Sequence, residues 1–410
     1  MNNLLKKTYR IIFFFFFFSF MLPLPTLAIK YLIMGVLAIV AFMLFAIRKD
    51  KKAIMTYVFW QMAWCAFMTF SIFWTLNTRL SLWAIFQVVL IFIMTFSVVV
   101  YVRNFNDLKR ILKAYYVAAL VMMLYVFSFM NITNLEGSRL GVEDDSGWNP
   151  NYISTYLALA IYAGYYVIWR TKKCIFLLRT FYLISTTLML VIIALSGSRT
   201  GFLAMLIPLF VIYVVKSKNA VRGVLLGLIT TIITVVIVMK VPVLFSNIGE
   251  RLLEMINILN EGEYAGGDAS RLFLANYGIE WFKQSPLFGY GINCFRVMSD
   301  TQTIFAGRNF YAHNNYVELL VDVGIVGFMI YYYLYFYMLK KKKYVQENIR
   351  PVFMGIFIFL LFVDIANVSY YDPIIQLVIV LEFLIIQLSK QNKNKKHEEE
   401  FKKVLITSRR

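Results

Sequence analysis

The sequence predicts an all-α, polytopic membrane protein with about twelve transmembrane helices and one large extracytoplasmic loop. The chain of 410 residues is 60% hydrophobic, whereas a soluble domain is about half apolar. Its long apolar runs mostly reach the roughly 20 residues that a helix needs to cross a bilayer. Its basic residues gather in alternate loops, as the positive-inside rule requires. A backbone in lipid must pair its own polar groups, so helices are the expected form of these runs.

Twelve apolar runs follow one another along the chain. They lie near 11–29, 31–47, 54–76, 81–102, 114–130, 151–169, 180–196, 200–215, 223–244, 316–338, 352–368 and 373–389. The first run, with TLA at 26–28, is similar to a signal peptide and its cleavage site. We expect it to remain as the first helix, and cleavage would leave the later orientation unchanged.

The basic residues predict the orientation. If the N-terminus is cytoplasmic, one side of the membrane carries RKDKK, RNFNDLKRILK, RTKK, KSKNAVR, KKKK and both chain ends. With Arg179 and Arg350 beside these loops, this side holds 31 of the 41 Lys and Arg residues. This bias predicts cytoplasmic termini and an even number of spans. We therefore expect a transmembrane domain over 1–389 and a solvated cytoplasmic tail over 390–410. The net charge of +19 reflects topology, so no nucleic acid is expected as a partner.

The sequence predicts neither disulfides nor a metal or other cofactor. Cys65, Cys174 and Cys294 fall on a helix, an inner loop and an outer loop, so they are not expected to pair. The acidic run EDD at 143–145 is a candidate for a divalent cation. No third ligand stands at a recognisable spacing, so we predict no metal there.

One outer loop, about 245–315, is long enough to fold as a small element, and such loops are usually functional. Within it, DASRLFLANYGIEWFKQSP at 268–286 predicts an amphipathic helix. The residues expected to share its apolar face are Leu272, Ala275, Ile279 and Phe282. Gly289 and Gly291 follow as a flexible turn.

Three polar clusters open helices that run inward from the outer surface. They are GWNPNYIS at 147–154, SGSRTGF at 196–202 and AHNNYVE at 312–318. Helix N-termini carry free N–H groups and a partial positive charge, which attract anions such as phosphate. Together with Arg199 and Arg271, they predict an anion-binding cradle. Taken singly, Asn149, Ser198 and Asn314 also suit ordinary N-caps.

His313, one of only two histidines, lies at the start of the tenth run. Glu318 and Asp322 follow it four residues apart, so they share one face of the helix. Asp322 would lie about 9 Å along that helix at 1.5 Å per residue, and ionisable groups at such depth are functional candidates. Asp364 and Asp372, near the outer ends of the last two helices, are weaker candidates of the same kind.

Three segments together resemble the bacterial O-antigen ligase and O-antigen polymerase (Wzy-like) family. They are SGSRTGFLA, HNNYVELLVDVGIVGF and a loop pattern made by Arg271, Trp281, Pro286, Gly289 and Gly291. The fit is best over roughly 147–330. The resemblance implies a GT-C-like, metal-independent glycosyltransferase that uses glycans linked to undecaprenyl diphosphate at the outer face of the bacterial cytoplasmic membrane. It also implies that Arg199, Arg271 and His313 form the site.

This chemistry suits the residue types. Negative charge builds on the departing diphosphate, and fixed guanidinium groups stabilise it in place of a metal ion. The acceptor hydroxyl must lose a proton, which requires a base. The pKa of histidine is about 6.5, and nearby arginines favour the neutral form that a base needs. We therefore predict His313, Arg199 and Arg271 as catalytic, and Ser198 with both arginines as diphosphate ligands. The predicted supporting residues are Asn149, Asn151, Asn314, Asn315, Glu318 and Asp322.

Two classes of function are considered. The favoured one is a polymerase of lipid-linked repeat units for capsule, exopolysaccharide or O-antigen, with a ligase as the alternative within the same class. A flippase and a chain-length regulator are further expected partners, beside the lipid-linked donor, the lipid-linked acceptor and the bilayer. The different class is a transporter or flippase of lipid-linked sugars. That class predicts repeats, broken helices and cationic groups in a central cavity, whereas here the polar residues gather at one surface.

Overall fold

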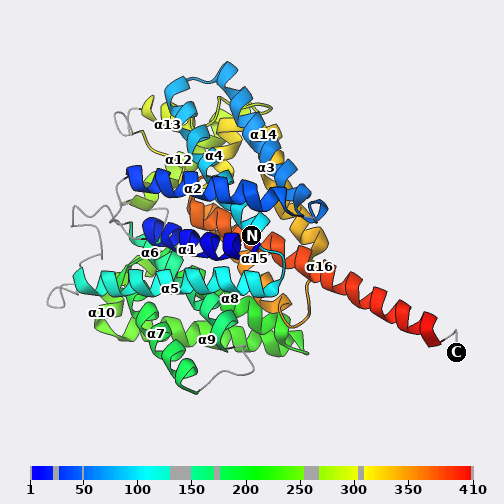
Figure 1. Ribbon diagram of the computed structural model, residues 1–410. Coiled ribbons are helices and arrows are strands. Elements are labelled where there is room, and N and C mark those ends of the chain that lie inside the picture. The colour runs from blue at the N-terminus through cyan, green and yellow to red at the C-terminus, as the bar shows by residue number, and fades with distance from the viewer. Residues whose placement is uncertain are drawn as a thin grey trace.

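The computed structural model shows a bundle of helices (Figure 1). The structure describes residues 2–21, 27–48, 50–129, 149–169, 176–253, 267–302 and 309–407. Its α-helices are α1 (Asn2–Met21), α2 (Leu27–Ala46), α3 (Lys52–Phe70), α4 (Thr78–Tyr101), α5 (Phe105–Phe129), α6 (Pro150–Gly164), α7 (Phe176–Leu195), α8 (Arg199–Lys216), α9 (Ala220–Lys240), α10 (Pro242–Leu244), α12 (Gly267–Gln284), α13 (Phe295–Asp300), α14 (Asn315–Lys341), α15 (Arg350–Ala366) and α16 (Pro373–Thr407). Shorter 3-10 and π segments are η1 (Ser71–Trp74), η3 (Tyr165–Trp169), η4 (Phe245–Gly249) and η5 (Lys342–Tyr344).

The predicted apolar runs overlap the helices α1–α9 and α14–α16. Eight of these helices are long and apolar enough to cross a membrane: α3, α4, α5, α7, α8, α9, α14 and α16. The chain is therefore a polytopic helical membrane protein. The first boundary differs from the prediction, because α1 begins at Asn2 rather than near residue 11. The polar first turns stay helical beside α5, where the Lys6 Nζ atom lies 3.5 Å from Asp107 Oδ2.

Helix α6 lies at the centre of the bundle and is buried on nearly all sides. It packs against α5, α7 and α8, while α8 packs in turn against α9 and α15. Helices α3, α4 and α14 form a separate group at the top of Figure 1, and α16 contacts both groups. One end of each of these two groups supplies residues of the candidate site.

The crossing of α6 and α8 depends on Gly201. A Cβ atom at this position would lie 2.1 Å from the Ser154 Oγ atom, far closer than van der Waals contact allows. The missing side chain therefore lets the two helices approach closely near their N-termini. This contact brings the polar starts of α6 and α8 together.

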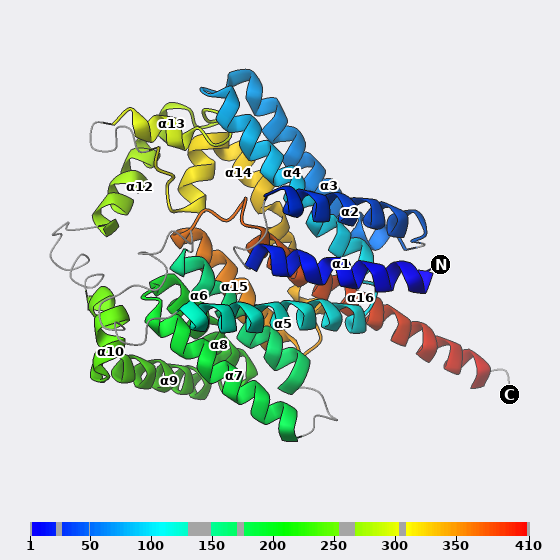
Figure 2. The ribbon, with the colours of Figure 1, turned by 60° about the vertical axis from the view of Figure 1, so that its left-hand side comes forward.

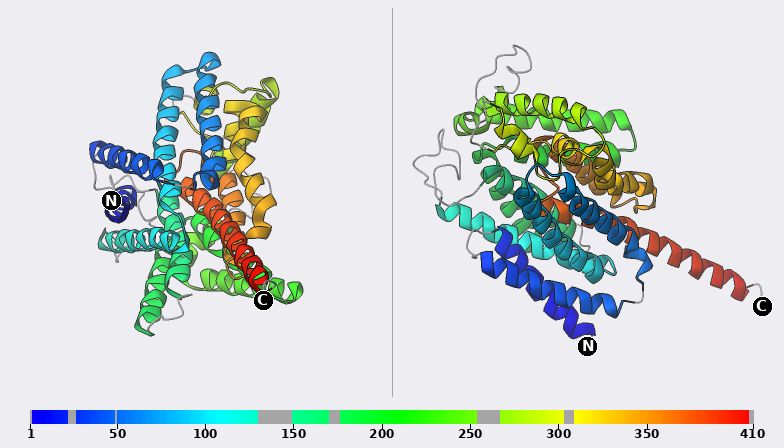
Figure 3. Two further views of the ribbon diagram at one scale, coloured as in Figure 1. Left: turned by 45° about the vertical axis from the view of Figure 1, so that its right-hand side comes forward. Right: turned by 90° about the horizontal axis from the view of Figure 1, so that it is seen from above.

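Both ends of the chain lie at the end of the bundle that carries the basic loops. Lys6 pairs with Asp107, and the Gln391 Nε2 atom donates to Asp50 Oδ2 at 2.6 Å. Helices α12 and α13 lie at the opposite end (Figure 2). Residues 390–407, predicted as a solvated tail, continue α16 as one helix of 35 residues. This part of α16 extends away from the bundle (Figure 3).

Candidate active site

Helix α12 lies where the sequence predicts an amphipathic helix, but its buried face differs from the predicted one. Leu274 and Trp281 are buried, and Gly278 packs against Val317 of α14. Leu272 and Ile279, predicted to share the buried face, are 40% and 47% exposed. Both faces of this helix carry apolar residues, so periodicity alone did not identify the face that meets α14. The observed packing places α12 directly beside the start of α14.

Helix α14 is broken at Gly324, which the sequence did not predict. Gly324 has a φ of 62°, a conformation that glycine adopts without strain. The N–H group of Ile325 donates to the Pro286 carbonyl at 2.9 Å, and the N–H group of Gly291 donates to the Asp322 carbonyl at 2.8 Å. The turn predicted at Gly289 and Gly291 is present, and both glycines have a positive φ. Its backbone is fixed by hydrogen bonds to the broken helix.

Glu318 and Asp322 are fully buried and bind backbone groups of the segment that precedes α14. The Asp322 carboxyl accepts N–H bonds from Asn293 and Phe295, both at 2.7 Å. Glu318 Oε2 accepts the N–H group of Ala312 at 2.6 Å. The two carboxyl groups thus fix the start of α13 and the residue before His313. Their supporting role in the chemistry of the site stays a prediction.

Arg296 of α13 joins the site, although the sequence analysis did not single it out. Its guanidinium donates to Asn293 Oδ1 at 3.0 Å and to the Tyr371 hydroxyl at 3.3 Å. It also lies over the Tyr311 ring, 5.0 Å from the ring centre. The only sequence signal was that Arg296 is one of few basic residues predicted on the outer side.

His313 lies beside these cationic groups, just before α14. It has a φ of 52°, and its ring centre is 3.9 Å from that of Tyr311. Burial, and after it the positive charges of Arg271 and Arg296, together lower the pKa of His313 to about 4. The imidazole is therefore neutral at pH 7, in agreement with the expectation for a base next to arginines.

The N-termini of α6 and α8 meet through two capping residues. Asn149 accepts the N–H group of Asn151 at 2.9 Å and caps α6. Ser198 accepts the N–H group of Gly201 at 3.1 Å and caps α8, while its hydroxyl donates to Asn151 Oδ1 at 2.7 Å. Ser198 is fully buried. Both of its hydrogen bonds serve the α6–α8 junction, so it positions Arg199 at the start of α8.

Arg199 lies with a second arginine. Its Nη1 atom donates to the Arg251 carbonyl at 3.2 Å, in the segment that follows η4. Arg251 was also not singled out from the sequence. The structure thus brings Arg271 and Arg296 to His313, and it brings Arg199 to Arg251.

The two asparagines after His313 have different roles. Asn314 caps α14 by accepting the N–H groups of Tyr316 and Val317 at 3.0 and 3.1 Å. Asn315 is buried and accepts the N–H groups of Ser369 and Tyr370. The prediction that Asn315 orients His313 or caps the helix is therefore wrong, because its amide ties α14 to the turn before α16.

Asp364 and Asp372 bind neighbouring polar groups at the C-terminal end of α15 and the N-terminal end of α16. Asp364 Oδ2 accepts the Tyr332 hydroxyl at 2.9 Å. Asp372 caps α16 and accepts the Tyr156 hydroxyl at 3.3 Å. Burial raises the pKa of Asp372 to about 6. These contacts make both residues part of the scaffold behind the site.

Among the described residues, no group of three His, Cys, Asp or Glu side chains could hold a metal ion. The acidic run at 143–145 and Cys174 lie outside the described residues. Cys65 and Cys294 are free thiols. The cationic groups of the site are its arginines.

The fold and the site define a multi-pass helical membrane protein with a cationic, histidine-containing site at one end of the bundle. Residues 184–332 match the family model described as O-antigen ligase. This segment contains Arg199, Arg271 and His313, so the resemblance drawn from the sequence is confirmed there. Proteins of this family are glycosyltransferase-like enzymes of bacterial membranes. No curated protein sequence matches the chain.

Proposed function

We propose that the protein is a polymerase that joins undecaprenyl-diphosphate-linked repeat units at the outer face of the bacterial cytoplasmic membrane. The observation that supports this most is the neutral His313 beside Arg271 and Arg296. A neutral imidazole can accept a proton, and two guanidinium groups can bind the anionic carrier of the donor. The product would be a capsule, an exopolysaccharide or an O-antigen. The abundance of Lys, Asn, Ile and Phe, typical of AT-rich coding, favours the first two.

In the proposed reaction, an acceptor hydroxyl attacks the anomeric carbon of the donor sugar. The bond from that carbon to the diphosphate oxygen breaks, and its electron pair leaves on the diphosphate. Arg271 stabilises the developing negative charge, and we extend this role to Arg296. The proton of the attacking hydroxyl passes to His313. The guanidinium groups replace a metal ion in this scheme.

The low pKa of His313 adds a consequence to this mechanism. A base with a pKa of about 4 is neutral at pH 7 but accepts protons weakly. A bound diphosphate offsets the positive field of Arg271 and Arg296, which raises the pKa of His313. Donor binding therefore makes the base stronger at the moment when it is needed.

Arg199 completes the donor site in this proposal. It starts α8, where the helix N-terminus adds partial positive charge, and it lies beside Arg251. Ser198 is proposed to hold this helix end rather than to bind phosphate directly, because both of its hydrogen bonds are internal.

The proposed topology has twelve spans and both termini in the cytoplasm. Four helices beyond the eight long apolar ones are included: α1, α2, α6 and α15. In a variant in which Cys294 is replaced, Lys283→Cys on exposed α12 should react with an impermeant thiol reagent in intact cells, and Lys342→Cys should not. The opposite labelling pattern would place the site in the cytoplasm and end the proposal.

The family description makes a ligase the second candidate, and one assay separates the functions. The purified protein is placed in lipid vesicles with a synthetic undecaprenyl-diphosphate-linked repeat unit. A ladder of products supports the polymerase, and transfer only to an added different acceptor supports the ligase. Transport without a new glycosidic bond would support a flippase, for which the broken helix α14 is a matching feature.

The same assay tests whether the reaction needs a metal ion. EDTA should leave the ladder of products unchanged. Loss in EDTA with recovery by a divalent ion would instead point to Glu143, Asp144 and Asp145.

A further inference from the structure

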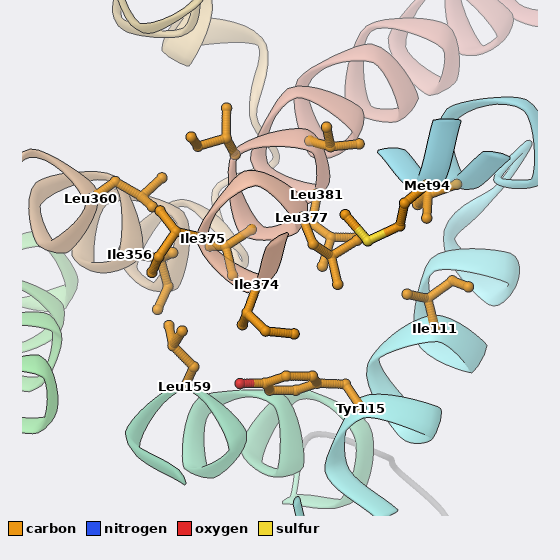
Figure 4. Close-up of a cluster of buried hydrophobic side chains, with 14 of the residues drawn as sticks. Met94, Ile111, Tyr115, Leu159, Ile356, Leu360, Ile374, Ile375, Leu377 and Leu381 are labelled. Atoms are coloured by element: carbon orange, nitrogen blue, oxygen red, sulfur yellow. The ribbon is translucent and has the colours of Figure 1, made fainter. Parts of the chain in front are cut away.

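A cavity lies between helices of the bundle, away from His313. Helices α5, α6, α15 and α16 line this cavity, which is partly open and has a volume of about 80 Å³. Its lining includes Tyr115, Leu159, Ile356, Leu377 and Leu381, which Figure 4 shows within a cluster of buried hydrophobic side chains. The residues that line the cavity are mostly apolar, and the cavity lies toward the end of the bundle that carries the basic loops. The outer loops that build the His313 site contribute none of the residues that line the cavity.

Glu382 is the one ionisable side chain in the wall other than tyrosines. It lies about 14 Å along α16 from Pro373 at 1.5 Å per residue, and it is 4% exposed. Its Oε2 atom is buried without a hydrogen-bond partner among the described residues. Buried polar atoms are nearly always paired, so an unpaired one needs an explanation.

The neighbouring polar groups do not pair with this carboxyl. Tyr115 donates to the Tyr156 carbonyl, and Tyr162 donates to the Met205 carbonyl. None of the ion pairs in the described part of the chain involves Glu382. An unpaired carboxylate in apolar surroundings is far more costly than the neutral acid. The neutral acid offers one O–H donor and a carbonyl acceptor.

This combination restricts what can fill the cavity. A buried water needs two to four polar partners, and an apolar wall with a single carboxyl offers few. A purely hydrocarbon molecule would leave the carboxyl unpaired. A hydroxyl-bearing head group on an aliphatic chain satisfies both the donor and the acceptor of Glu382, and its chain fits the walls.

We propose that this cavity binds an aliphatic lipid that ends in a neutral hydroxyl-bearing group, with Glu382 as the hydrogen-bonding partner of that group. Two sources share this chemistry, a long-chain alcohol and a protonated fatty acid. The chain would lie against Leu159, Ile356 and Leu377. The site is distinct from the proposed glycan site, so it does not depend on the proposed function.

Photolabelling of the full-length protein in lipid nanodiscs tests this site. The probes are a diazirine-bearing palmitic acid and the corresponding alcohol, and mass spectrometry locates the labelled peptides. We expect at least one probe to label the cavity-facing segments of α5, α15 or α16 and to be displaced by its unlabelled form. The probe that labels identifies the head group.

Matched variants separate cavity binding from general contact with lipid. Glu382→Gln keeps a donor and an acceptor and should retain labelling. Glu382→Leu should lower it about tenfold, because the hydrogen bonds of the head group are lost. Ile356→Trp fills the cavity and should abolish labelling, whereas Ile358→Trp, on the exposed face of α15, should not.

Val378→Trp is a second filling variant if Ile356→Trp does not fold by size-exclusion chromatography. Equal labelling of wild type, Glu382→Leu and a folded filling variant would overturn the proposal. Labelling of the cavity segments by neither probe would overturn it as well.

Discussion

Two arginine-containing regions lie at one end of the helix bundle, and they are built differently. The first, made by Arg271, Arg296 and His313, is fixed by the buried carboxyl groups of Glu318 and Asp322. Its backbone includes residues with positive φ and a broken helix. The second starts at Arg199, and neutral capping groups fix it at the junction of two regular helices.

This difference suits the two regions to different steps of the proposed reaction. The first region contains a titratable base whose pKa responds to nearby charge, whereas the second offers arginines at a helix N-terminus. Proton transfer needs a group that changes its charge, and charge stabilisation needs groups that do not. We therefore assign the proton step to the first region and anion binding to both.

The largest expected effect is that of His313→Ala. Removal of a general base typically costs about 100- to 10,000-fold in rate, so chain growth should nearly stop while lipid-linked single repeat units accumulate. Donor binding should persist, because the arginines remain. The measurement is the product ladder of the purified variant in lipid, with donor binding measured in parallel. Normal ladders would remove His313 from the mechanism.

The arginine variants test whether both regions bind the donor. Arg199→Ala and Arg271→Ala should each lower the rate about 100- to 1,000-fold, because each loses contacts to the leaving diphosphate. Arg199→Lys should recover only part of the activity, since lysine lacks the planar, two-pronged donor geometry. As a control, each variant should insert into the membrane as the wild type does. Full activity in Arg199→Ala would confine the donor site to the α12–α14 region.

The two regions also differ in how much of their structure the sequence could predict. Apolar length located the helices, and the polar clusters of SGSRTGF and AHNNYVE located both regions. The sequence also contains Gly324, but the residues around it do not show that α14 will break there. The break depends on hydrogen bonds between the backbone near Gly324 and the distant segment 286–291. Arg296 was missed for the same reason. Its place beside His313 depends on Asp322, which binds the start of α13 across a long loop.

The scaffold of the first region has a smaller expected effect, which Asp322→Asn measures. Asparagine has one acceptor oxygen where Asp322 has two, and its NH₂ group would face a backbone N–H group. The free energy of unfolding should fall by about 1–3 kcal/mol, seen as a lower thermal midpoint in detergent. Glu280→Gln is the control, because it breaks an exposed ion pair with Lys283 worth little. Equal shifts in the two variants would contradict the anchoring role of Asp322.

The smallest expected effect is a shift in the pKa of His313, and it separates the two regions most directly. The chain has two histidines, so His397→Asn leaves a single imidazole that NMR of labelled histidine can titrate without any activity assay. The pKa should lie near 4 in this background, with the neutral form present above that pH and lost as the pH falls through it.

Arg271→Gln should raise the pKa of His313 by up to about one unit, because a neighbouring cation is removed. Arg199→Gln should leave it unchanged. Inorganic pyrophosphate should raise it in the parent by offsetting the arginines. A pKa near the ordinary 6.5, or equal shifts in both arginine variants, would contradict the assignment of the proton step to the first region.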